Sequence, residues 1–205
     1  DADLIATYVY KNRDNIQPTR LPAPAISELK KLLSIRNLYV RQCATLKSSL
    51  KEHRAQFSTE FLKQMEQRNN QLIDSIQEHI SFIEIQIEKL VNSDEEMKKN
   101  AKLSQSVIGI GPVITWYLIA TTGNFKNFST SRKYSTYGGI APFPNGSGIK
   151  KGRNRVSQLG DKQIKSLLSN GALAAIQYDP ELRNYYQKKI SQGKVKGVAL
   201  NNVKN

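Results

Sequence analysis

A glycine-rich, basic segment in the second half of the chain has residue types suited to chemistry on a phosphate. Ser147 lies between two glycines, so we expect its hydroxyl to be exposed on an open turn. A serine nucleophile for phosphodiester transfer needs open approach, neutralisation of the phosphate charge and a group that takes its proton. Residues 138–155 hold no His, Asp or Glu for that last task. Four cations that could neutralise a phosphate follow the serine: Lys150, Lys151, Arg153 and Arg155. A simple turn beside phosphate-binding cations is the alternative interpretation.

A second candidate is the glycine turn Gly109-Ile-Gly111, which is followed by Pro112. The pattern predicts a helix that ends at Ile108, a tight hairpin, and a new helix opened by Pro112. It resembles the helix-hairpin-helix motif, in which Gly109 and Gly111 would let backbone amides hold a DNA phosphate without reading its sequence. The alternative is a tight corner between two helices.

The charge of the chain is concentrated in its second half. The 31 Lys and Arg against 17 Asp and Glu give a formal charge of +14, and residues 101–205 alone hold 16 basic and 3 acidic residues. Such a surface favours a polyanionic partner, so nucleic acid is the leading prediction, and a merely soluble basic half is the alternative.

The composition disfavours disulfide-stabilised, zinc-binding and membrane-spanning proteins. Cys43 is the one cysteine, so no intrachain disulfide can form, and the two histidines lie too far apart in sequence to suggest a zinc site. No apolar run approaches the roughly 20 residues that span a bilayer, and we expect a cytoplasmic protein without a membrane partner. The chain begins at Asp1 without Met, which suggests a piece of a longer protein.

The elements that would position these residues are predicted to be mainly α-helical, in three stretches. Residues 1–24 are a short amphipathic segment and a proline-containing loop. Residues 25–103 contain no Gly or Pro and predict two long helices with a turn near His53–Thr59, where Ser58 or Thr59 would cap the second. One side of the second helix carries a heptad seam, which indicates a helical hairpin or coiled coil: Ile73, Ile76, Ile80, Ile83, Ile87 and Leu90. We expect dimerisation through this seam, and packing against another part of the protein is the alternative.

The third stretch, residues 104–205, contains all 12 glycines. Helical patterns cover 113–121, 161–177 and 180–191, with Asp161 as a cap, and a glycine-rich loop covers 138–160. No alternating strand pattern stands out beyond Tyr137–Ala141. The lysine-rich end, 188–197, predicts either a mobile nucleic-acid-contacting arm or a disordered end.

The motifs of this third stretch resemble one known family, the DEDD insertion-sequence transposases described as bridge-RNA-guided recombinases. The resemblance rests on Gly109-Ile-Gly-Pro, Phe125-Lys-Asn-Phe128, Tyr137-Gly-Gly-Ile-Ala-Pro142, Ser147-Gly148, Lys151, Gly160-Asp161 and Lys165-Ser-Leu-Leu168. It implies that Ser147 is the nucleophile that links covalently to DNA. Where the family often has a second serine, this chain has Gly146.

The resemblance extends to the start of the chain. Asp1-Ala2 matches the end of the Asp-x-x-Asp-Ala pattern in the family's RuvC-like nuclease domain, which implies that Asp1 is the last of four carboxylates that bind Mg²⁺. The other three carboxylates are not in this sequence, so the chain alone is expected to be inactive. The resemblance also implies a guide RNA and an active site assembled from two protomers.

These observations predict a DNA transposase that cleaves and exchanges strands through Ser147 and a metal-dependent site. A non-catalytic DNA-binding and dimerisation module is the alternative, and a scaffold for protein partners would leave the basic half unexplained. Four tyrosines are interpreted as packing or base-stacking residues rather than nucleophiles: Tyr134, Tyr137, Tyr185 and Tyr186.

Overall fold

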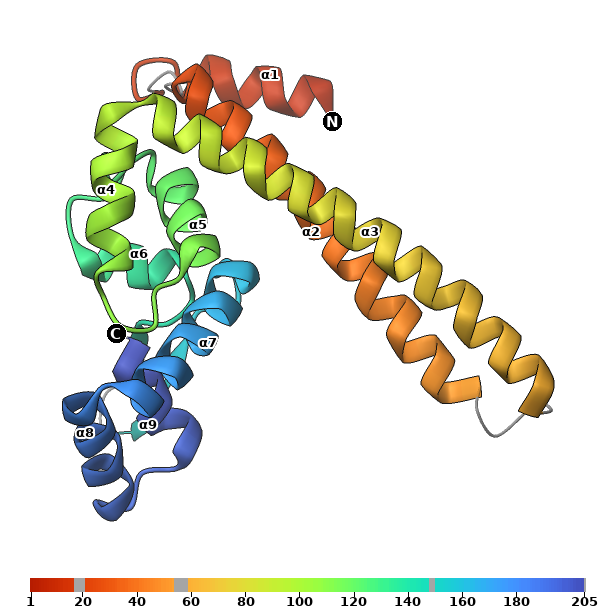
Figure 1. Cartoon of the computed structure of the whole chain (residues 1–205). Helices are drawn as coiled ribbons and strands as arrows, with labels where there is room; N and C mark the ends of the chain where they lie inside the picture. Colours follow the sequence, from red (N-terminus) through yellow and green to blue (C-terminus); the bar gives the residue numbers. More distant parts are fainter. Residues whose placement is uncertain (17–20, 54–58, 148–149, 205) are drawn as a thin grey trace.

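Helices make up most of the chain, as the sequence predicts. The computed structural model describes residues 1–16, 21–53, 59–147 and 150–204, and these form nine helices and one two-stranded sheet (Figure 1). In chain order the elements are α1 (Ala2–Lys11), α2 (Pro24–His53), α3 (Thr59–Ser93), α4 (Glu95–Gln105), α5 (Pro112–Thr122), α6 (Ser131–Tyr137), β1 (Pro142–Ser147), β2 (Lys150–Val156), α7 (Lys162–Tyr178), α8 (Pro180–Ser191) and α9 (Lys196–Lys204).

Helices α2 and α3 form a long antiparallel hairpin that projects from the rest of the molecule (Figure 1). The helix ends agree with the prediction, because α2 ends at His53 and α3 begins at Thr59, whereas residues 54–58 of the predicted turn, including Ser58, lie outside the described residues. The isoleucine seam of α3 packs on α2 of the same chain, with Ile73, Ile83 and Ile87 buried. Dimerisation through this seam stays a prediction.

The second predicted helix is wrong in one respect, because it divides into α3 and α4. Asp94 interrupts it: its Oδ1 accepts a hydrogen bond from the Met97 amide at 2.8 Å and caps α4. Asp is a favoured N-cap, and the Glu95 and Glu96 that follow stabilise a helix N-terminus. Helix α4 then ends at Gln105 rather than at Ile108, because a turn in which the Ile110 amide donates to the Val107 carbonyl replaces its last residues.

The main hydrophobic core lies where the base of the α2–α3 hairpin meets α4, α5 and α7. The side chains of Leu29, Ile87, Met97, Ile119 and Ile164 are almost fully buried there. Helix α5 is apolar on nearly every side, as expected for a helix covered by several neighbours. Trp116, on this helix, is a core residue.

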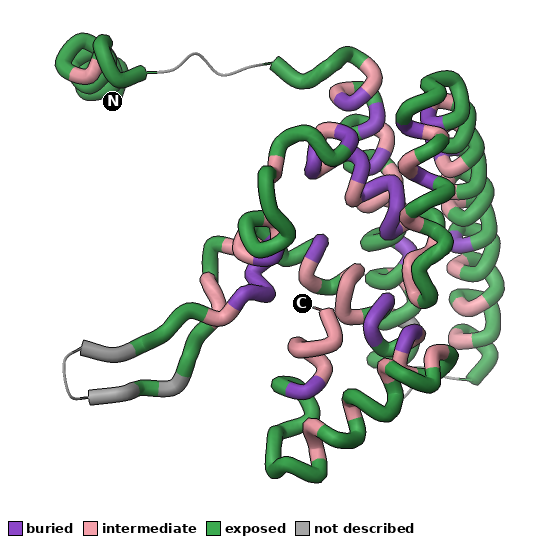
Figure 2. The backbone as a smooth tube through the Cα atoms, turned by 90° about the vertical axis from the view of Figure 1, so that its left-hand side faces the viewer, coloured by how far each residue is buried: buried purple, intermediate pink, exposed green. Residues whose placement is uncertain are grey.

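The segment predicted as a loop at 138–160 is instead largely a β-hairpin. Strands β1 and β2 pair antiparallel, with Phe143 opposite Arg155 and Ser147 opposite Lys150. The register is irregular between Phe143 and Asn145, around Pro144, which has no amide to donate to a ladder. The suggested strand at Tyr137–Ala141 is also wrong, because α6 ends at Tyr137 and the chain turns before β1 begins. Figure 2 shows the hairpin extending from the body of the molecule.

The end of the chain is helical where a mobile arm or disordered end was predicted. Lys188 and Lys189 belong to α8, and Lys196 begins α9. Helix α9 packs against α7 and α8 with Ala199 fully buried, and the Asn201 Nδ2 donates to the Ile140 carbonyl at 2.9 Å. This packing holds the end of the chain against the body, which explains why the prediction fails.

Helix α1 lies apart from the body in Figure 2, and none of its residues is buried. In the part of the chain that the structure describes, no helix is both long enough and apolar enough to cross a membrane.

Candidate nucleic-acid interface

The glycine turn between α4 and α5 packs backbone against backbone on α7. Gly109 has a φ of +91°, and a Cβ there would lie 2.3 Å from the Gly171 carbonyl oxygen. A Cβ on Gly171 would in turn lie 2.8 Å from the Gly109 carbonyl oxygen. Both positions therefore require glycine, and together they fix the turn on α7.

Gly111 differs from Gly109 because its surroundings are open. It has a φ of −86°, it is the N-cap residue of α5, and nothing lies within 4 Å of where its Cβ would be. Amides in the first turn of a helix have no acceptor within that helix. An open Gly111 therefore leaves room for an anion to approach the start of α5, as the predicted phosphate contact requires.

The β-hairpin brings the predicted nucleophile and two of the predicted cations to one end. Ser147, the last residue of β1, is opposite Lys150, and Gly146 is opposite Lys151. Gly148 and Ile149 lie outside the described residues, as do the side chains of Ser147, Lys150, Lys151 and Arg153. The Arg155 side chain is exposed nearer the base of the hairpin.

The base of the hairpin is held by Asp161 and a pair of glycines. The Tyr137 hydroxyl donates to Asp161 Oδ2 at 3.1 Å, and Asp161 Oδ1 accepts from the amides of Gln163 and Ile164. The predicted cap of α7 is thereby confirmed. A Cβ on Gly160 would lie 2.3 Å from the Gly139 Cα, so the two chain segments leading into and out of the hairpin are in direct backbone contact.

Two of the tyrosines are held in their protonated form. Burial raises the pKa of Tyr134 to about 12, although a hydrogen bond with Thr121 Oγ1 at 3.0 Å opposes the shift. Burial, with the nearby Asp161 carboxylate, also raises the pKa of Tyr137. A phenol with a raised pKa is a poor nucleophile, which agrees with the interpretation of these tyrosines as packing residues. The Lys189 ammonium lies over the Tyr185 ring, 5.2 Å from the centroid of that ring.

Asp1, the predicted metal ligand, occupies the N-cap position of α1 and is exposed. Its side chain makes no capping hydrogen bond. Within the described residues, no group of three or more His, Cys, Asp and Glu side chains could hold a metal ion. Figure 2 shows α1, which begins directly after Asp1, well apart from the described part of the β-hairpin.

Positive charge in the second half is largely uncompensated. Among the lysines and arginines that the structure describes from residue 101 onward, Lys126 is the one in an ion pair, with Glu96. Burial, with a smaller contribution from the Lys165 ammonium, lowers the pKa of Lys204. Sequence reasoning did not single out Lys204 or Arg132, because neither lies in a recognisable motif.

The comparison with known proteins concerns this same part of the chain. Residues 101–187 match the Transposase IS116/IS110/IS902 family. The match includes the glycine turn, α6, both strands of the hairpin, α7, and the first part of α8. It therefore supports the resemblance that the motifs indicate.

Individual relatives carry matching names. The uncharacterized 43.6 kDa protein of insertion element IS110 from Streptomyces coelicolor is 27% identical over 114 residues, which are 56% of this chain and 28% of that protein. A probable family 20 transposase from Pseudomonas aeruginosa is 26% identical over 104 residues, or 51% of this chain and 30% of that protein. The transposase for insertion sequence element IS1111A from Coxiella burnetii is 29% identical over 97 residues, or 44% and 27%. The chain thus spans less than a third of the length of these relatives.

Proposed function

We propose that this chain is the later part of a DNA transposase, in which the basic half holds DNA and the β-hairpin presents Ser147 to a phosphate. One observation carries the proposal: the strand register places Ser147 beside Lys150 at the end of a hairpin whose base is fixed by Asp161. The hairpin lies inside the range that matches the transposase family. The charge of the surrounding half supports a nucleic acid as the substrate.

In the proposed reaction, Ser147 Oγ attacks the phosphorus of a DNA phosphodiester. A bond forms between Oγ and phosphorus as the bond from phosphorus to the 3′ oxygen breaks. The products are a phosphoserine link to one DNA strand and a 3′-hydroxyl on the other, so the serine proton is balanced by the proton gained at the leaving oxygen. Lys150, Lys151, Arg153 and Arg155 would stabilise the charge that develops on the phosphate.

Mg²⁺ enters the proposal through Asp1 alone. The described residues do not themselves fit a Mg²⁺ site, because Asp1 belongs to no group of three or more His, Cys, Asp or Glu side chains among them that could hold a metal ion. We therefore propose only that Asp1 contributes one ligand to a site completed by other residues of a longer protein. A RuvC-like metal site of that kind would polarise the scissile phosphate.

A guide RNA and self-association complete the proposal. The candidate DNA contacts are to phosphates, which carry no sequence information, so target choice would have to come from elsewhere. Pairing with a guide RNA would provide it, as the resemblance implies. Assembly of two or more copies would bring the metal site of one protomer to the serine of another.

The test traps the covalent intermediate. Full-length protein, Mg²⁺, guide RNA and a nicked donor–target substrate are combined, and adducts are located by denaturing gel and peptide mass spectrometry. We expect a nucleotide adduct on the peptide that contains Ser147, lost in Ser147→Ala and retained in Ser157→Ala, a matched serine just beyond β2. Cleavage without an adduct would make water the nucleophile and leave Ser147 a turn residue.

The alternative function is a non-catalytic DNA-binding and dimerisation module. It would need only the excess of positive charge in residues 101–205, which hold 16 basic and 3 acidic residues. In that case, Ser147→Ala would leave DNA binding and strand transfer by the full-length protein unchanged, whereas the transposase proposal predicts retained binding with lost strand transfer.

A further inference from the structure

The turn that follows α5 holds an aromatic residue in an unfavourable backbone conformation. Gly123, Asn124 and Phe125 are consecutive and have φ values of +60°, +59° and +65°. Glycine and asparagine adopt this left-handed region readily, but a bulky phenylalanine rarely does. Such outliers cluster at binding and active sites, where the surrounding structure enforces them.

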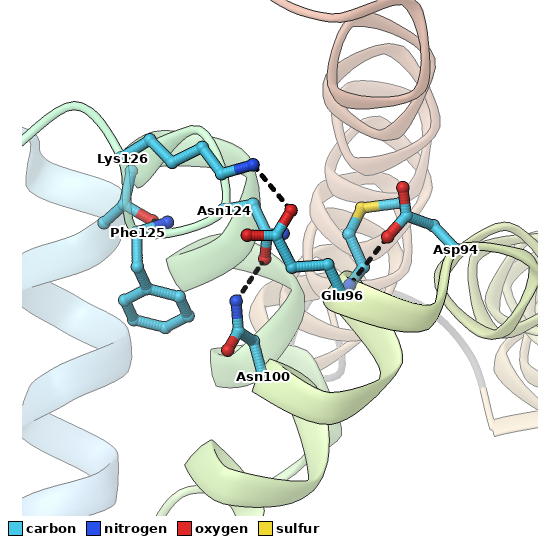
Figure 3. A network of polar contacts seen from close by, with 8 residues as sticks. Asp94, Glu96, Asn100, Asn124, Phe125 and Lys126 are labelled. Atoms are coloured by element: carbon cyan, nitrogen blue, oxygen red, sulfur yellow. Dashed lines mark hydrogen bonds and ion pairs between the residues drawn. The ribbon is translucent and has the colours of Figure 1, made fainter.

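A polar network enforces this conformation (Figure 3). The buried Asn124 side chain accepts a hydrogen bond on Oδ1 from Asn100 Nδ2 of α4 at 2.9 Å. Lys126 forms an ion pair with Glu96, which also belongs to α4. The Phe125 amide donates to Thr122 Oγ1 at 2.8 Å. Figure 3 shows the Phe125 ring pointing away from this network, and 45% of the residue is exposed.

The Phe125 ring lines an apolar pocket of about 230 Å³ between α5 and α6. Leu118, Phe128 and Tyr134 form other walls, and Ser131 lies at its α6 side. The rings of Phe128 and Tyr134 meet edge to face, with centroids 5.2 Å apart, so these two walls support each other.

A second pocket, polar and of about 430 Å³, shares Ser131 with the first. It is lined by Arg132, Ser135, Tyr185 and Asn202. Arg132 Nη2 also donates to the Pro142 carbonyl at 3.2 Å, which places this pocket at the base of the β-hairpin. No acidic side chain of the described residues lines either pocket.

An apolar aromatic pocket beside a polar pocket that contains an arginine matches the two parts of a nucleotide. A base removed from its stack is bound by stacking on aromatic and apolar side chains, and its phosphate is bound by cations and hydroxyls. We propose that Phe125 stacks on one unpaired nucleobase of a bound nucleic acid, and that Arg132 and Ser131 hold the phosphate beside that base. The proposal rests on the proposed nucleic-acid-binding role of the basic half.

The test separates recognition of the base from contact with the backbone. The full chain is titrated with three DNA duplexes that are fully paired, carry one bulged 2-aminopurine, or carry an abasic residue in place of that base. We expect the base-containing bulge to bind about 10-fold more tightly than the abasic one, since stacking on one aromatic side chain is worth about 5- to 150-fold. The fluorescence of the 2-aminopurine should report the stacking directly.

Phe125→Asn is the informative variant, because asparagine tolerates the left-handed backbone and the fold is retained. Its melting temperature should equal or exceed that of the unmodified chain, while the preference for the base over the abasic residue should disappear. Phe82→Asn, at an exposed phenylalanine of α3, should keep that preference. Arg132→Gln should weaken binding to both bulges equally.

Equal affinity for the base-containing and abasic duplexes would overturn the stacking inference, and so would a preference for the base that persists in Phe125→Asn. In either case, binding to the paired duplex would still support the proposed nucleic-acid-binding function. Failure to bind any duplex would overturn both. Single-stranded DNA and RNA oligonucleotides of one sequence then identify the source of the base: tighter binding of one of them, lost in Phe125→Asn, assigns the pocket to that nucleic acid.

Discussion

At the residue scale, the two glycines of the turn before α5 differ in how strongly the structure requires glycine. Gly109 combines a left-handed backbone with a would-be Cβ 2.3 Å from the Gly171 carbonyl, whereas Gly111 is open. We expect Gly109→Ala to lower the free energy of unfolding by roughly 2–4 kcal/mol, because strain and overpacking add. Gly111→Ala should lower it by at most about 1 kcal/mol, the usual effect of a poor N-cap.

Urea unfolding and binding to a paired DNA duplex distinguish the two variants. If the amides at the start of α5 contact a phosphate, Gly111→Ala should weaken duplex binding several-fold while the protein stays folded. Unchanged binding would mean that the turn is only a corner between helices, and equal destabilisation by the two variants would contradict the packing difference.

The raised pKa of Tyr134 predicts that the folded protein loses stability at alkaline pH. In the unfolded chain a tyrosine ionises near pH 10, but burial holds the pKa of Tyr134 at about 12 in the folded protein. Above pH 10 the unfolded state therefore binds fewer protons than the folded state, so stability falls as pH rises. The expected fall from this residue is about 1.4 kcal/mol per pH unit between pH 10 and 12.

Urea unfolding between pH 8 and 11.5 measures this dependence. Tyr134→Phe should make the alkaline fall shallower, even though it lowers stability at neutral pH by removing the hydrogen bond to Thr121. Tyr178→Phe, at an exposed tyrosine, is the control and should leave the slope unchanged. The same slope in Tyr134→Phe and the unmodified chain would contradict the raised pKa.

At the element scale, Asp161 links α7 to the β-hairpin. It caps α7 through Oδ1 and accepts the Tyr137 hydroxyl on Oδ2. Asp161→Ala should lower the free energy of unfolding by about 1–2 kcal/mol and raise hydrogen exchange in β1 and β2. Asp179→Ala removes a similar cap, from α8, and should cost a similar amount without affecting the hairpin. Equal exchange in the two variants would contradict the link.

The helices were predictable because apolar residues repeat along them. Residues 161–177 carry a helical pattern behind a capping Asp161, and the structure places α7 there. The β-hairpin has no such signal, because its strands contain glycine, proline and exposed residues such as Asn145 and Arg155 in place of an alternating apolar face. Helix α9 is short and basic, and its packing depends on Ala199, a small residue that leaves little trace in a pattern.

The candidate site, like the fold, could be predicted from the sequence only in part. Ser147 and its cations were predicted as a site from residue types and a family resemblance, and that role stays a prediction; the strand register adds that Ser147 is opposite Lys150. The aromatic pocket was beyond sequence reasoning, because it depends on a left-handed backbone at Phe125 and on side chains brought together from α5 and α6. A pattern along the chain does not report either feature.

At the scale of the whole molecule, the change in net charge along the chain coincides with the boundary between the projecting α2–α3 hairpin and the rest of the molecule. The projecting α2–α3 hairpin belongs to the nearly neutral first half, whereas the excess positive charge belongs to the half that contains the β-hairpin (Figure 1). The two parts are joined through the core around Leu29, Ile87 and Ile119. We therefore expect nucleic acid to be held at the end that contains the β-hairpin, away from the α2–α3 arm.

The salt dependence of DNA binding tests this division. Each phosphate neutralised by a cation releases counterions, so the logarithm of affinity falls with the logarithm of salt concentration at about −0.9 per contact. If the four cations of the β-hairpin each contact a phosphate, they alone contribute a slope of about −3.6. Arg155→Gln should make the measured slope shallower by about 0.9, and Lys63→Gln, at an exposed lysine of α3, should leave it unchanged.

Fluorescence anisotropy with a paired duplex at several salt concentrations gives these slopes. An equal effect of Lys63→Gln would mean that the long arm also lies on the DNA, and the charge division would not separate two functions. A slope near zero for the unmodified chain would remove phosphate contact as the basis of binding altogether. The expected pattern, with Arg155 contributing and Lys63 silent, would place the DNA on the same end of the molecule as Ser147, where strand transfer would have to occur.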